Sequence, residues 1–435
     1  MYVKATSDRT TGPDINDEDN LKYLQIGSTA NFAVSGNLMY LVDSEGGDSY
    51  TTMNAFEFFG LFWNCSNLID ASGLSLPSET STMCYYGTFM CCVALTEAPA
   101  LPATTLAQNC YRDMFNGCTL LTTAPALPAS KLEYNCYRQM FKGCSSLDAV
   151  TCLATDISAG TCTTDWLYGV ASSGTLTVPN GMEDNWTKNS SSGCPTGWNV
   201  CIFGKGTAAV SGTNAGRTSC GWVQLWENGP KFAEFNVGAT ISSYGSLDAT
   251  VESYSGWVAG YNTANVGGLY PWHNSTLNGR TTTWDENVTT ETVDVATSLW
   301  GDNWQEPTRA NLNNLRNYDA DGENELTGDD ALTVWTWCSG EEGSQYVSGC
   351  TLAGYKVSGK EGTAYENNNI FLPVTGYYEY YDKKILSAST CGVYWSSDTY
   401  NDGHQGYNMG FESSGPGVAV GCYQYGYSVR VVLVE

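Results

Sequence analysis

The chain has 435 residues, more than one hydrophobic core usually organises, so its length predicts two or three domains. Its formal net charge is −26, from 45 acidic and 19 basic residues, which opposes binding to nucleic acid or to anionic lipid surfaces. We also expect no membrane insertion, because the sequence has no apolar run of about 18 residues.

The N-terminal half contains a repeat. Phe89, Phe115 and Phe141 are separated by intervals of 26 residues. The same interval separates the cysteines Cys92, Cys118 and Cys144 and the leucines Leu95, Leu121 and Leu147. This period predicts a leucine-rich-repeat solenoid in which each unit pairs a short strand with a helical turn. Because the cysteines keep the register of leucine and phenylalanine, we expect them to be buried free thiols rather than disulfides.

The repeated pattern xMFxGCxxLxxAPxLPAxxLxxxCY resembles the BspA-like class of leucine-rich repeats. The resemblance covers residues 25–201, preceded by an arm at residues 1–24. We expect caps around Thr29–Asp48 and Asp156–Val200, because the end repeats must close their apolar faces. The resemblance implies adhesion or spacing on a bacterial surface or in a gut phage. A stiff stalk that binds nothing is the alternative.

Beyond the repeats, residues 202–216 are rich in Gly, Ser, Thr and Asn and are predicted to form a linker. Trp222–Trp226 is typical of a strand. Arg309–Leu315 is a predicted helix, because Pro307 and Thr308 precede it and its leucines are spaced for one face. Few helices among many short strands predict an α+β domain over residues 217–435.

Four motifs in this second half carry a resemblance: FAEFNVGA, LWGDNWQEPTRANLNNL, NNNIFLPVTGY and GVYWSSDTY…YGYSVRVV. In this order they resemble the C-type-lectin-like domain called the Fibrobacter major paralogous domain. Related domains include the variable proteins of diversity-generating retroelements. The predicted fold class is therefore α+β multidomain, a leucine-rich-repeat solenoid followed by a C-type-lectin-like domain. The resemblance implies that the last strands present the ligand surface, on a framework of Trp304, Pro307, Leu312, Leu315, Phe371, Leu372, Pro373, Trp395, Val429 and Val431.

The stretch between Trp395 and Tyr427 mixes Tyr, Ser, Asn, Asp, Gly and His in irregular order. These residue types suit adaptable binding surfaces, since tyrosine gives rigid contact area and the small polar residues give hydrogen bonds. Alternation places Phe411 toward the core and Asn408 and Glu412 on the opposite face. The predicted ligand contacts are Asp398, Tyr400, Asn401, Asp402, His404, Gln405, Asn408, Glu412, Tyr423, Gln424 and Tyr425. An ordinary solvated run of turns is the alternative for each of them.

Little in the sequence indicates catalysis. The histidines are His273 and His404, and neither lies in a nucleophile motif. The acidic run at residues 319–330 departs from calcium-loop spacing and is predicted to be a surface loop. Cys391 and Cys422 do not reproduce the surroundings of a formylglycine-generating site, although Cys338, Cys350, Cys391 and Cys422 leave disulfide pairing open. We expect no enzyme activity, metal or cofactor.

These patterns together predict a receptor-binding or adhesive protein that contacts a bacterial surface protein or glycan. Residues 1–9 lack the apolar core of a signal peptide, which favours a virion component such as a phage tail fibre over a cell-surface adhesin. Other virion proteins would then be partners, and a homo-oligomer such as a trimer would add avidity. A structural decoration protein without a ligand is a further alternative.

Overall fold

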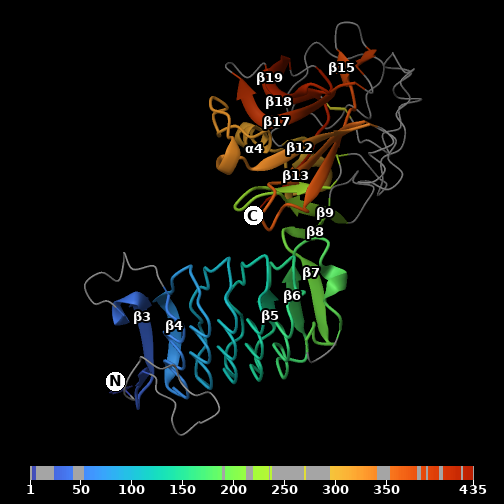
Figure 1. Ribbon diagram of the computed structural model, residues 1–435. Helices are drawn as coiled ribbons and strands as arrows, with labels where there is room; N and C mark the ends of the chain where they lie inside the picture. The colour runs from blue at the N-terminus through green and yellow to red at the C-terminus, as the bar shows by residue number, and fades with distance from the viewer. Residues whose placement is uncertain are drawn as a thin grey trace. The chain divides into compact units, whose positions relative to one another are not determined.

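The computed structural model describes residues 2–5, 24–42, 53–188, 192–211, 219–234, 236–237, 269–270, 294–339, 353–379, 384–387, 390–400, 405–422 and 425–434. The chain divides into two compact units, Met1–Phe203 and Gly204–Glu435 (Figure 1). Within the described ranges, no helix has the length and apolar character needed to cross a membrane.

The predicted α+β fold class is wrong. The described residues form mostly short strands in small sheets, and their α-helices are limited to two short segments in the second unit. The repeats of the first unit contain turns in place of the helical turn expected of a leucine-rich-repeat solenoid. The second unit is also mainly β, so neither half fits the α+β description given to it.

Parallel strand pairs mark both ends of the first unit. Strand β3 pairs with β4, and β5, β6 and β7 form a three-stranded sheet. An antiparallel pair, β1 and β2, joins residues of the predicted N-terminal arm to the start of the unit. The elements are β1 (Tyr2–Ala5), β2 (Leu24–Gly27), β3 (Phe32–Asn37), η2 (Leu38–Leu41), β4 (Leu68–Ser75), β5 (Ala149–Thr151), β6 (Gly174–Val178), η3 (Glu183–Asn185) and β7 (Trp198–Ile202).

A turn-rich arc in each repeat explains the absence of helical turns. Successive amides along the arc alternate between two kinds of acceptor. One amide donates to the next repeat, as Gly87 N–H does to the Arg112 carbonyl at 3.0 Å, and the following amide donates within its own turn, as Thr88 N–H does to the Tyr85 carbonyl at 3.3 Å. Every fourth residue has a positive φ, as at Met83 (56°), Gly87 (59°) and Cys91 (61°). An α-helix requires consecutive right-handed residues, so this backbone cannot be helical. The same positions recur at Asn109, Asp113 and Gly117 and at Asn135, Gln139 and Gly143.

Stacked aromatic rings fill the interior of the repeats. Phe89 and Phe115 lie 5.4 Å apart between ring centroids, and Phe115 and Phe141 lie 5.6 Å apart. A second stack comprises Phe58, Tyr85, Tyr111, Tyr137, Trp166 and Trp186. Beside the phenylalanine stack, the Cys144 thiol donates to the Phe115 carbonyl at 3.0 Å. The predicted buried free thiols of the repeats are thus confirmed at Cys84, Cys92, Cys110, Cys118, Cys136 and Cys144.

The second unit contains several small antiparallel sheets. One of five strands has the order β11-β20-β10-β9-β8, and the meanders β12-β13-β14 and β17-β18-β19 have three strands each. Its first strand, β8, occupies residues expected to be a linker. The elements are β8 (Lys205–Ala209), β9 (Ser219–Gln224), β10 (Lys231–Ala233), α3 (Val295–Trp300), β11 (Trp304–Gln305), α4 (Arg309–Leu315), η5 (Gly328–Asp330), β12 (Thr333–Cys338), β13 (Gly354–Gly359), β14 (Asn369–Pro373), β15 (Tyr377–Glu379), β16 (Lys384–Leu386), β17 (Gly392–Tyr400), β18 (Gln405–Glu412), β19 (Gly415–Cys422) and β20 (Val432–Leu433).

Helix α4 confirms the helix predicted over Arg309–Leu315. Thr308 caps it, accepting from Asn311 N–H at 3.1 Å, while the Asn311 side chain accepts from Thr308 N–H at 2.9 Å. Leu312 and Leu315 are buried. The ten predicted framework residues are likewise all buried.

Arg430 is a fully buried cation that joins three segments of the second unit. Its guanidinium donates to the carbonyls of Ala233 at 2.9 Å, Glu234 at 2.5 Å and Phe371 at 2.7 Å. A planar guanidinium can satisfy several carbonyls at once, which few other side chains can do. Arg430 therefore connects the end of β10 and strand β14 to the segment that leads into β20.

Replacing Arg430 with Met should destabilise the second unit by about 3 kcal/mol or more, because three carbonyls would lose their donor. Calorimetric unfolding of the full chain measures the effect. Arg430→Lys should recover only part of the loss, since one ammonium cannot reproduce the spread of the guanidinium. A melting temperature unchanged by Arg430→Met would contradict the assigned role.

Burial of the repeat thiols makes the first unit sensitive to alkali. Burial raises the pKa of Cys84, Cys136, Cys144 and Cys152 from 9.0 to about 12. Above pH 9 the unfolded chain loses these protons while the folded chain keeps them. The stability that they contribute is therefore complete below pH 9 and is lost as the pH rises toward 12.

We expect each of these thiols to remove about 1 kcal/mol of unfolding free energy between pH 8 and pH 10. Calorimetry in the presence of a reductant can measure this fall. Cys144→Ala should make the fall smaller, and replacement of the exposed Cys201 by Ser should leave it unchanged. An equal fall in the wild type and in Cys144→Ala would refute the explanation.

Candidate ligand-binding site

The predicted contacts come mainly from the meander β17-β18-β19. Tyr400, the last residue of β17, pairs with Gln405, the first residue of β18, and Gln405 pairs with Cys422, the last residue of β19. The hairpin between β17 and β18 therefore turns at the same end of the sheet at which β19 finishes. We call this the hairpin end.

An arginine and two tyrosines meet close to the hairpin end. The guanidinium carbon of Arg309 lies 4.4 Å from the centroid of the Tyr407 ring, and the Tyr400 ring meets that ring edge-on at 5.5 Å. The Arg309 side chain also donates to the Asp321 carbonyl at 2.7 Å. Tyr400, Tyr407 and Arg309 are each partly exposed. We call Arg309, Tyr400, Gln405 and Tyr407 the hairpin cluster.

Asp398 positions this cluster. Its carboxylate accepts a hydrogen bond from Arg309 N–H at the first turn of α4. A negative charge is favourable there, because the first amides of a helix have no intrahelical partner. The residue predicted to touch ligand thus holds the backbone of Arg309 against β17.

Two predicted contacts lie elsewhere. Asn408 is buried, with 4% of its surface exposed, whereas alternation placed it on an open face. Its amide and the Tyr427 hydroxyl cover Gly421, where an added Cβ would meet them at 3.0 and 2.7 Å. Glu412 is exposed but pairs with Gly415 at the opposite end of the sheet. The structure does not bring Asn408 or Glu412 into the hairpin cluster.

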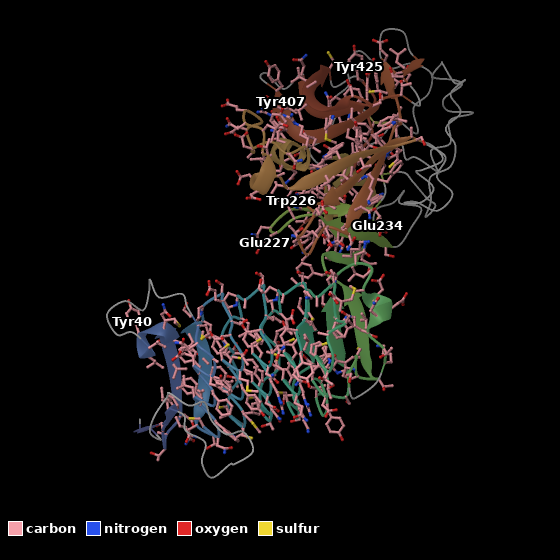
Figure 2. All side chains as sticks on the ribbon, viewed as in Figure 1. Tyr40, Trp226, Glu227, Glu234, Tyr407 and Tyr425 are labelled. Carbon is pink, nitrogen blue, oxygen red and sulfur yellow. The ribbon has the colours of Figure 1, made fainter. Side chains whose placement is uncertain are left out.

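Tyr425 belongs to a second aromatic group. Its ring centroid lies 6.3 Å from that of Tyr377 and 6.0 Å from that of Tyr427. Tyr427 in turn packs on the buried Trp395 at 4.2 Å. Figure 2 shows Tyr407 and Tyr425 at separate places on the second unit. The predicted contacts Asn401, Asp402, His404, Tyr423 and Gln424 lie outside the described residues, as does His273.

Sequence reasoning missed Arg309, Tyr407 and Tyr377. Arg309 was assigned to a helix, and nothing in the sequence brought that helix to β18. Tyr407 was placed on the face of Phe411, and both do share it, but Tyr407 stays partly exposed while Phe411 is buried. The position of Tyr407 near the end of the strand is the signal in the sequence, because a sheet face that is covered at its centre is often open at its edge.

The thiols of the second unit are arranged differently from a reactive pair. Cys391 precedes the residue paired with Phe411, whereas Cys422 pairs with Gln405, so they adjoin opposite ends of β18. Burial raises the pKa of Cys391 to about 11, so its thiol is protonated near neutral pH. Cys391 and Cys422 are free thiols, Cys338 is buried, and Cys350 lies outside the described residues.

In the acidic run at residues 319–330, the Asp319 carboxylate is hydrogen-bonded by residues of the same run. Asp319 accepts from Glu323 N–H at 2.9 Å and from the Asn324 amide at 2.6 Å. Hydrogen bonding from Asn324 lowers the pKa of Asp319. Within the part of the chain that the structure describes, no three His, Cys, Asp or Glu side chains are grouped as metal ligands would be.

Comparison with known proteins adds one similarity. Residues 361–432 match a family described as a domain of unknown function, DUF8237. No curated protein matches the chain, and no solved structure matches it. The matched segment includes the whole meander and Arg430.

Replacing Asp398 with Ala should lower the stability of the second unit by about 1 kcal/mol, because Arg309 N–H loses its acceptor. Calorimetry measures the change. Glu412→Ala is the matched control, since it removes an exposed carboxylate from the same sheet. Equal effects of the two substitutions would show that Asp398 does not hold α4.

Proposed function

We propose that the protein is a non-enzymatic binding protein whose second unit contacts a bacterial surface protein or glycan through the hairpin cluster. The observation that carries the proposal is the convergence of Arg309, Tyr400 and Tyr407 on the end of a hydrogen-bonded sheet. Tyrosine and arginine dominate the energetics of binding surfaces, because they bury large areas and still offer hydrogen bonds.

The support beneath the cluster suits this role. Tyr407 extends from a strand whose next residues on the same face, Met409 and Phe411, are buried. Asp398 holds Arg309, so the guanidinium lies over the ring before any ligand arrives. A surface preorganised in this way loses less conformational entropy on binding than a mobile loop.

The proposed setting is host recognition by a virion, with other virion proteins and further copies of this chain as partners. Several copies would allow weak single contacts to act together. A bacterial cell-surface adhesin is the alternative setting, and the same surface would serve there.

The proposal predicts that Tyr400→Ala and Tyr407→Ala each reduce binding to susceptible bacterial cells by roughly tenfold, since each removes an aromatic contact at the centre of the cluster. A panel of gut bacteria incubated with fluorescently labelled full chain gives the bound fraction. Tyr425→Ala tests the second aromatic group independently.

Tyr40→Ala is the matched control, because Tyr40 is a tyrosine of the first unit with 42% of its surface exposed (Figure 2). Melting temperatures establish that each variant is folded. If Tyr400→Ala and Tyr407→Ala bind as well as the wild type, the hairpin cluster is not the binding surface. Binding lost only in Tyr425→Ala would move the site to the second group.

A further inference from the structure

Positively charged side chains gather on the outward positions of the repeat arcs. Arg112 and Arg138 occupy the same position in successive repeats, and Lys142 follows four residues after Arg138 at the next outward position. The repeats lie directly beside one another, because Asp113 N–H donates to the Arg138 carbonyl at 3.0 Å and Gly117 N–H to the Lys142 carbonyl at 2.7 Å. We call Arg112, Arg138 and Lys142 the cationic stripe.

Two cations of the stripe have no carboxylate partner within the described residues. Arg112 pairs with Asp113 at 3.3 Å, but neither Arg138 nor Lys142 makes such an ion pair. The Nε atom of Arg138 is buried and has no hydrogen-bond acceptor.

Exposed aromatic rings accompany these charges. The Lys142 ammonium lies 6.0 Å from the centroid of Tyr168, and the Arg112 guanidinium lies 5.0 Å from that of Tyr86. Tyr168 is 50% exposed, and Tyr134, which lies four residues before Arg138 at another outward position, is 48% exposed. The stripe is therefore lined by flat apolar faces.

The sign of the stripe's charge is opposite to that of the chain as a whole. The chain carries a net charge of −26, yet among the described residues this surface presents two cations without an ion pair. The Asp113 carboxylate that pairs with Arg112 is buried, and burial raises its pKa. The Asp165 carboxylate accepts from the Gln139 amide at 3.3 Å. Charges farther away than about 8 Å are largely screened at physiological ionic strength. An anionic ligand at the stripe therefore experiences mainly the local charges, and Arg138 and Lys142 are the stripe's cations without an ion pair to a described residue.

We propose that the cationic stripe binds an acidic polysaccharide through its carboxylates. Arg138 would donate paired hydrogen bonds to a carboxylate, and Lys142 would add a second charge contact. The exposed rings of Tyr134 and Tyr168 favour a sugar polymer over an acidic peptide, because they can stack on the apolar faces of pyranose rings. This surface lies on the first unit and is independent of the hairpin cluster.

Binding of the full chain to immobilised polygalacturonate, with neutral dextran as a reference, tests the proposal. Arg138→Gln with Lys142→Gln should weaken binding by roughly tenfold or more. Lys131→Gln removes a positive charge from an exposed ion pair with Glu133 and should bind like the wild type. Binding should also weaken as salt concentration rises.

Lys142→Glu provides a second variant in case the substitution at Arg138 impairs folding, and Tyr400→Ala should leave this binding unchanged. Equal binding by the wild type and by Lys142→Glu would overturn the proposal. Binding to poly-glutamate with no binding to polygalacturonate would show that the stripe takes an acidic peptide and would overturn the assignment of a polysaccharide.

Discussion

The constraint on which this structure depends is that buried amides must find acceptors on neighbouring segments, because the described chain contains so little helix. In the repeats, alternate amides donate across to the next repeat, so each repeat needs its neighbour. This requirement imposes the constant interval between repeats. The constant interval in turn aligns the phenylalanine rings and places the thiols of Cys92, Cys118 and Cys144 beside carbonyls.

The same constraint governs the second unit, where side chains hydrogen-bond backbone groups that the strands leave without a partner. Arg430 supplies donors to carbonyls of separate segments, and Asp398 supplies an acceptor to the first amide of α4. In both cases a charged side chain is held by backbone groups. The hairpin cluster inherits its geometry from the second of these contacts, since Asp398 fixes the helix turn from which Arg309 extends.

The sequence predicted the elements whose evidence is local or periodic. The interval between Phe89 and Phe115 identified the repeats and their buried thiols, and Thr308 identified the start of α4. The helical turns of the repeats were wrongly predicted, because the outcome depends on positive φ values at residues such as Met83 and Cys91. Neither residue type favours that conformation, so inter-repeat hydrogen bonding imposes it.

The candidate site was predictable as a segment but not as a set of contacts. Strand alternation assigned Asn408 correctly to the face opposite Phe411, yet both faces of β18 are covered there. Residues distant in sequence provide that cover: Trp395 and Tyr427 belong to one buried cluster, and Phe411 and Tyr355 to another. The hairpin end escapes such cover, and there Tyr400 and Tyr407 remain partly exposed beside Arg309. A binding surface is therefore expected where side chains at the end of the sheet stay uncovered by other segments. Sequence periodicity alone does not show where that cover ends.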